Sequence, residues 1–358
     1  MIASFKNIEA CNDFQRKKKK IFNLGISALR MIACFLVVTS HFPIATKSKI
    51  LINLLKYRPY HVPIFFTVSF YLSYNTFKSN NICKIIKRFE RLLIPYICWP
   101  IIILCVNSVI YHKFSINLPH SLISLTKQLL FGVSYLDVFW FQWDLIFISL
   151  VFIIIICLCK KNYYFFLILL MFISIYFSYS GTNLKIFSKY PYHKKYTLGR
   201  ISESIPFCVI GFLLGGTELT KFCEKYRFKV LFFTFLFQYF FIKFNIFTDF
   251  NGFMYQGLDK VVVSSLIFLL FELFPSNIIS NKIIITGIKQ ITNYTMGIYV
   301  LHVPIAKYMN VKIINYKSVN IVHSGNFTAS LIIYLICYLC SFLCIKIVKI
   351  TKMSNLFS

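Results

Sequence analysis

Long apolar runs separated by short polar and basic segments are the main feature of this sequence. A bilayer core about 30 Å thick requires roughly 20 residues of α-helix, and most of the runs approach that length. We therefore predict an all-α fold, a polytopic transmembrane helical bundle of about ten helices. The predicted spans are Met31–Ile50, His61–Phe77, Leu92–Tyr111, Gln142–Cys159, Tyr163–Tyr179, Glu203–Gly216, Phe228–Phe247, Lys260–Phe274, Ile291–Met309 and Phe327–Val348.

The composition excludes the two other broad classes. Of the 358 residues, 58% are hydrophobic and only 14% are charged. Soluble domains are roughly 45–50% apolar and about 25% charged, so this chain has too few charges to cover a soluble surface. A disordered chain would be rich in charge and poor in aromatic residues, whereas 19% of these residues are aromatic. An integral membrane protein is the class that remains.

The basic residues indicate topology. The chain has 39 Lys and Arg against 11 Asp and Glu, a net charge of +28, and they cluster between apolar runs. Such clusters suit anionic lipid headgroups and argue against a nucleic-acid partner. The block Arg16–Lys20 should hold the N-terminus in the cytoplasm and lacks the features of a cleavable signal. An even number of spans then returns the C-terminus to the cytoplasm.

We therefore expect a cytoplasmic basic segment at residues 1–22, a transmembrane domain at 23–350 and a cytoplasmic tail at 351–358. Lys160, Lys161, Lys221, Lys225 and Arg227 should face the cytoplasm. Residues 112–141 should lie along the outer interface. Basic residues from Lys185 to Arg200 fall in one predicted external loop, so the loop bias is modest. The orientation rests mainly on the N-terminal block.

The 12 cysteines are not spaced as a disulfide framework. Cys337, Cys340 and Cys344 share a helical face, which invites a metal-site interpretation. No histidine or acidic side chain accompanies them, so packing is the better interpretation and no metal site is predicted.

Arg30 and His41 are the first candidates for chemistry. They are eleven residues apart, which is three helical turns plus about 20°, so their side chains project from one face about 16 Å apart along the axis. An arginine at the inner membrane edge and a histidine near the midplane would suit an anion whose reactive end reaches inward. The alternatives are a headgroup anchor for Arg30 and an interhelix hydrogen bond for His41.

Arg88 and Arg91 form a second candidate pair just before the third predicted span. Their i, i+3 spacing places them on one helical face, where two guanidiniums could hold phosphates. From position alone, anchoring at the inner headgroups is the favoured interpretation.

These motifs together carry a resemblance. The Arg-x10-His pattern of LRMIACFLVVTSH and the Arg88–Arg91 pair leading into IPY resemble the acyltransferase-3 family of integral-membrane O-acyltransferases. HVPIFFTVSFYL (residues 61–72) resembles its H-x-P-x-F-F-x-x-S-G-x-L segment, especially in the sugar O-acetylase branch. FWFQWDL (139–145) is similar to its W-F-x-x-x-L motif, and GIYVLH (297–302) to its late G-I-Y-L-x-H motif. Two departures are Phe70 in place of a glycine and the acidic Asp144.

The resemblance implies transfer of an acyl group, usually acetyl from cytoplasmic acetyl-CoA, to a hydroxyl of a surface polysaccharide, oligosaccharide or lipid-linked sugar. Arg30, Arg88 and Arg91 would then hold the coenzyme A phosphates, and His41 would be the catalytic base. Whether His41 deprotonates the acceptor or carries the acetyl group itself is left open. No permanently bound cofactor is expected.

Weaker substrate candidates are His61, Trp140 and His302, and for His302 a structural hydrogen bond is favoured. A buried pair with a basic neighbour is the favoured interpretation of Asp144, whereas Glu272 has no partner that the sequence suggests. The expected partners are a carbohydrate acceptor, membrane lipid and glycan-assembly proteins. The composition suits a bacterial plasma or inner membrane. The rival function is a transporter or flippase for such glycans, but no internal repeat supports it.

Overall fold

The computed structural model describes residues 23–40, 57–79, 81–110, 139–183, 192–243, 258–274, 281–302, 332 and 334–343. Its labelled helices are α2 Leu24–Ser40, α4 His61–Lys78, α5 Ile82–Ile110, α7 Trp140–Cys159, α8 Tyr163–Asn183, α9 Tyr192–Leu214, α10 Thr217–Lys225, α11 Arg227–Lys243, α12 Leu258–Glu272 and α13 Lys282–Asn293. Two short 3-10 turns are η1 Arg58–Tyr60 and η2 Lys160–Asn162, and residues 295–302 and Tyr334–Leu343 are also helical. No strand occurs in these ranges, which confirms the all-α prediction.

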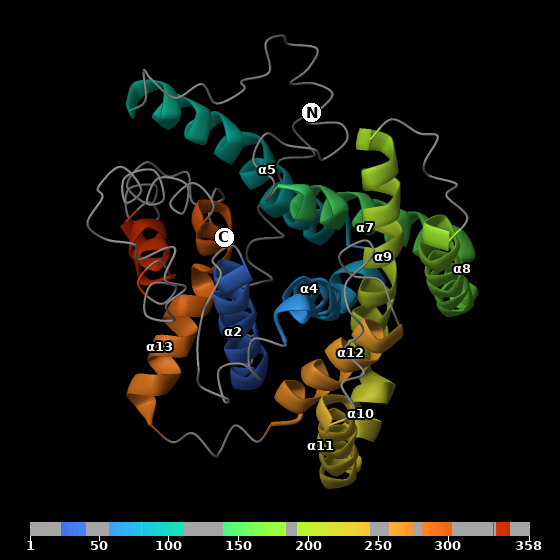
Figure 1. Ribbon diagram of the computed structural model, residues 1–358. Helices are drawn as coiled ribbons and strands as arrows, with labels where there is room; N and C mark the ends of the chain where they lie inside the picture. Colours follow the sequence, from blue (N-terminus) through green and yellow to red (C-terminus); the bar gives the residue numbers. More distant parts are fainter. Residues whose placement is uncertain are drawn as a thin grey trace.

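Helix α4 lies at the centre of the bundle (Figure 1), where α2, α5, α7, α9 and α12 all pack against it. The largest core cluster joins α4 to α5, α7 and α9 through aromatic side chains. Phe70 of α4 is fully buried, with its ring 4.6 Å from that of Phe152 and 5.9 Å from that of Phe77. Phe70, at the position where the resemblance expects a glycine, therefore fills space in this core.

The close backbone approach of α4 occurs one turn away from Phe70, against α9. A Cβ on Gly211 would lie only 2.1 Å from the carbonyl oxygen of Thr67. Only glycine lets two helix backbones come this close. Gly211 thus allows the close contact between α4 and α9, and position 70 does not take part in that contact.

The segment Trp140–Ser178 is the one helical stretch, among the described residues, that is long and apolar enough to cross a membrane. Its 39 residues would extend about 58 Å as one straight helix, nearly twice the thickness of a bilayer core. The polar turn η2 divides it, with Lys160 at φ 42°, a conformation rare outside glycine. The break falls between the predicted spans Gln142–Cys159 and Tyr163–Tyr179.

Leu24–Val38 and Tyr334–Leu343 are shorter apolar helices, and the number of ten spans stays a prediction. Helices α8 and α11 nevertheless turn large apolar side chains outward, for example Phe165 at 64% and Phe228 at 81% exposure. Contiguous apolar surface of this kind is costly in water and suits contact with lipid.

Two expectations about single segments are wrong, and one helix extends beyond its predicted span. Helix α9 begins at Tyr192, so Lys194, Lys195 and Arg200 belong to a helix and not to an external loop. Helix α5 begins at Ile82, ten residues before the third predicted span, so Arg88 and Arg91 lie on a helix, as their spacing predicts. The predicted span Ile291–Met309 contains a break, because α13 ends at Asn293 and a turn at Tyr294 precedes the helix at 295–302.

Candidate active site

The candidate base, His41, directly follows Ser40, the last residue of α2, and lies outside the described residues. Its shared face with Arg30 and its burial therefore stay predictions. The other candidates can be placed, and they occur in four separate surroundings.

Arg30 lies in the middle of α2 and is half-buried against the turn that follows α13. Its Nη2 donates a hydrogen bond of 2.9 Å to Oγ1 of Thr295. Thr295 in turn donates to the carbonyl of Thr292, and the hydroxyl of Thr292 donates to the carbonyl of Ser27 on α2. The Thr295 hydroxyl thus holds the guanidinium, and Thr292 joins the same segment to α2.

Arg88 of α5 is buried, with 9% of its surface exposed. Its guanidinium donates to the hydroxyl of Ser73, to that of Ser149 at 3.2 Å and to that of Ser69 at 3.4 Å. Its charge also lies 5.0 Å from the ring centre of Phe77 and 5.5 Å from that of Phe70. A headgroup anchor, which the position of Arg88 alone favours, is therefore wrong for this side chain.

Arg91 points elsewhere although it is one turn from Arg88. Its side chain is exposed, and its Nε donates to the carbonyl of Lys87 at 3.1 Å. The i, i+3 spacing therefore does not bring the two guanidiniums into one site. A contribution of Arg91 to phosphate binding stays a prediction, and it would come from the surface side.

Asp144 has the basic neighbour that the sequence analysis favoured. Arg200 of α9 forms two parallel hydrogen bonds of 2.8 Å with the Asp144 carboxylate, and both side chains are buried. The same guanidinium lies 5.1 Å from the ring centre of Trp140. The sequence missed Arg200 as the partner because it is 56 residues away and falls in what was predicted as a loop.

His61, Trp140 and His302 border one aromatic cluster. Phe65 of α4, Phe141 of α7 and Tyr299 lie with ring centres 5.3–6.3 Å apart in each pair. His61 precedes Phe65 by one turn, Trp140 precedes Phe141 directly, and His302 follows Tyr299 by one turn. The structure thus gathers the first turns of α4 and α7 and the helical residues 299–302.

Both histidines of this group are buried. His302 is fully buried, and its Nδ1 lies 2.5 Å from the carbonyl oxygen of Tyr299, in the manner of a structural hydrogen bond. His61 is 8% exposed at the start of α4. Contact of any of the three candidates with an acceptor stays a prediction.

Glu272 also has partners that the sequence did not suggest. Asn23 donates to its Oε2 at 2.7 Å, and the hydroxyl of Tyr71 donates to its Oε1. Asn23 also caps α2, because its side chain accepts from the amide of Ile26 at 2.9 Å. The start of α2 is therefore bound to α4 and α12, which fixes the helix that carries Arg30.

The charges around the three interior arginines differ. Arg200 is neutralised by Asp144. Arg88 donates to three serine hydroxyls and Arg30 to one threonine hydroxyl, and neither has a carboxylate partner within the described ranges. In those same ranges no group of three His, Cys, Asp or Glu side chains is placed to hold a metal ion. A groove of about 530 Å³ beside α11 and α12 is lined by none of the candidate residues.

Comparison with known proteins gives one match. The family model of acyltransferase-3, described as an acyltransferase domain, matches residues 23–348. Searches of curated proteins and of solved structures gave no match.

Proposed function

Because the chain belongs to the acyltransferase-3 family and is thus a membrane acyltransferase, we propose that it is an O-acetyltransferase acting on surface glycans. It transfers acetyl from acetyl-CoA to a hydroxyl of a surface polysaccharide, oligosaccharide or lipid-linked sugar. The family match does not support the transporter alternative. A bacterial plasma or inner membrane, with both termini in the cytoplasm, completes the proposal.

The proposal that acetyl-CoA is the donor rests on the guanidiniums of Arg30 and Arg88, which lie in the interior without a carboxylate partner among the described residues. A buried cation is costly unless an anion or strong hydrogen bonds compensate it. Serine and threonine hydroxyls supply hydrogen bonds to Arg88 and Arg30 but no negative charge. Both residues are therefore suited to receive an anion, and coenzyme A is a polyanion whose phosphates arginine binds well.

The proposed reaction assigns proton transfer to His41. The sugar hydroxyl gives its proton to the neutral imidazole while its oxygen attacks the thioester carbonyl carbon. The carbon–sulfur bond then breaks, and the proton passes from the imidazolium to the coenzyme A sulfur as the thiol leaves. In the second route the imidazole nitrogen attacks the thioester carbon first, the carbon–sulfur bond breaks, and coenzyme A leaves as the thiolate. The sugar oxygen then attacks the acetyl group on His41, the bond between nitrogen and acetyl breaks, and the hydroxyl proton passes to the coenzyme A thiolate.

The experiment that tests this function is His41→Ala, with the exposed neighbour Ser40→Ala as the matched control. Removing a general base costs about 10²–10⁴-fold in rate, so acetyl groups on the purified surface glycan should fall below detection by mass spectrometry. Ser40→Ala should leave them unchanged, and both variants should insert in normal amount. Normal acetylation by the His41→Ala strain would refute the assignment.

A further inference from the structure

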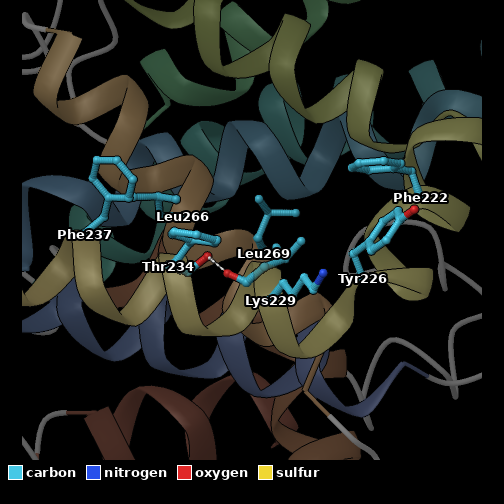
Figure 2. Close-up of a pocket in the computed structure, with 9 residues that line it drawn as sticks. Phe222, Tyr226, Lys229, Thr234, Phe237, Leu266 and Leu269 are labelled. Carbon is cyan, nitrogen blue, oxygen red and sulfur yellow. Dashed lines mark hydrogen bonds between the residues drawn. The ribbon is translucent and has the colours of Figure 1, made fainter.

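The groove beside α11 and α12 has one charged end and an apolar remainder. Phe222 and Tyr226 lie at the end where α11 begins, and Phe237 and Leu266 lie at the other (Figure 2). The side chain of Lys229 lies between them and extends toward Tyr226. The hydroxyl of Thr234 lies between these ends, but it donates to the carbonyl of Val230 at 2.7 Å. A molecule in the groove would therefore meet mainly apolar side chains and one lining cation, Lys229, on the side of Tyr226.

Positive charge is concentrated at that end of the groove. Residues 221–229 contain four basic side chains and one acidic side chain, Glu224. The ammonium groups of Lys225 and Lys229 lie 5.4 and 5.8 Å from the ring centre of Tyr226. Arg227 is used differently, because its Nε donates to the carbonyl of Leu273 and joins α11 to α12. Lys229 therefore lines the groove, and Lys225 lies beside it against the same ring.

We propose that this groove is a binding site for an anionic phospholipid. Its phosphate pairs with Lys225 and Lys229, and one acyl chain lies between α11 and α12 along Phe233, Leu269 and Phe237. From Lys229 to Phe237 is eight residues, so the apolar part extends about 12 Å along α11. The charged end belongs to the segment predicted to face the cytoplasm, where anionic headgroups attract lysine.

Lipid binding is measured directly and is independent of the proposed acetyl transfer. The full chain in neutral detergent is titrated with pyrene-labelled phosphatidylglycerol and with phosphatidylcholine of the same acyl chains. Phosphatidylglycerol should bind about tenfold more tightly. Lys225→Gln with Lys229→Gln should remove this difference, and Lys282→Gln, an exposed lysine on α13, should preserve it.

The acyl-chain part of the site is tested by filling it. Val230→Trp, within the groove, should weaken binding of both lipids, whereas Val262→Trp on α12, which does not line the groove, should not. Phe237→Glu is a second variant that folding should tolerate, because the side chain is 51% exposed. Equal affinity for the two lipids, or binding unchanged by both groove variants, would overturn the proposal.

Discussion

At the scale of single residues, Arg88 and Arg91 show that two identical side chains three residues apart can lie in different surroundings, one buried and one exposed. Arg88 points into the contact between α4, α5 and α7, where three serine hydroxyls and two phenylalanine rings surround it. Arg91, three residues later, is exposed. Interaction with an anion is stronger at the buried position because water and salt screen it less.

The first prediction concerns acetyl-CoA binding by these two residues. Arg88→Gln should raise the Kd for acetyl-CoA about tenfold or more, since a hydrogen bond to a charged group contributes about 1.5–3 kcal/mol. Arg91→Gln should raise it by at most about fivefold, because exposed ion pairs contribute about 0.2–1 kcal/mol. Isothermal titration of the detergent-purified variants measures both. An unchanged Kd for Arg88→Gln would show that the buried guanidinium is structural only.

At the scale of helices, α4 and α9 are held together at a contact that leaves no space for a side chain. Gly211 faces the backbone of Thr67, and Gly215 similarly faces Tyr74, where a Cβ would lie 2.6 Å from the Cβ of Tyr74. Because the opposing atom at Gly211 is backbone, it cannot move away as a flexible side chain would.

We therefore expect Gly211→Ala to force α4 and α9 apart. The new methyl would lie 2.1 Å from the Thr67 carbonyl oxygen, so overpacking should destabilise the protein by about 1–3 kcal/mol. Gly287→Ala is the matched control, because nothing lies within 4 Å of a Cβ there on helix α13. That variant should be neutral or more stable by up to about 1 kcal/mol. Thermal unfolding in detergent distinguishes them, and equal melting temperatures would contradict the close contact.

The pair between Asp144 of α7 and Arg200 of α9 gives a second prediction at this scale. Asp144→Asn leaves the Arg200 charge buried without its carboxylate, which should cost about 3–5 kcal/mol of stability. Replacing both, as Asp144→Leu with Arg200→Met, should cost much less because no charge is left uncompensated. Thermal unfolding again measures the effect. If the double variant were less stable than Asp144→Asn, the uncompensated charge of Arg200 would not be the cause of the lost stability.

At the scale of the whole molecule, the predicted topology places the η2 turn in the cytoplasm. Lys160 and Lys161 are exposed in a turn between two apolar helices, as expected for a headgroup-level loop. Alkaline phosphatase, which is active only outside the cytoplasm, should therefore be inactive when fused after Asn162. A fusion after His120, in the predicted outer segment, should be active. The opposite pattern would reverse the orientation.

The sequence alone determined the fold class and the family of this protein. Apolar runs of near-membrane length leave the α-helix as the backbone structure that satisfies its own hydrogen bonds in lipid. The motifs from Leu29 to His302, taken in order, were enough to identify the family that the match over residues 23–348 shows. Local spacing also predicted the break near Lys160, because two lysines cannot remain in the apolar core.

Only the tertiary structure decided which charged side chains are paired. Arg200 pairs with Asp144, 56 residues earlier in the sequence, and Glu272 accepts a hydrogen bond from Asn23, 249 residues earlier. Arg88 is buried, whereas Arg91 is exposed. Such partners depend on how helices rotate and approach one another, which is set by contacts such as Gly211 against Thr67. Helical periodicity fixes which residues share a face of one helix, but it does not say what that face will contact.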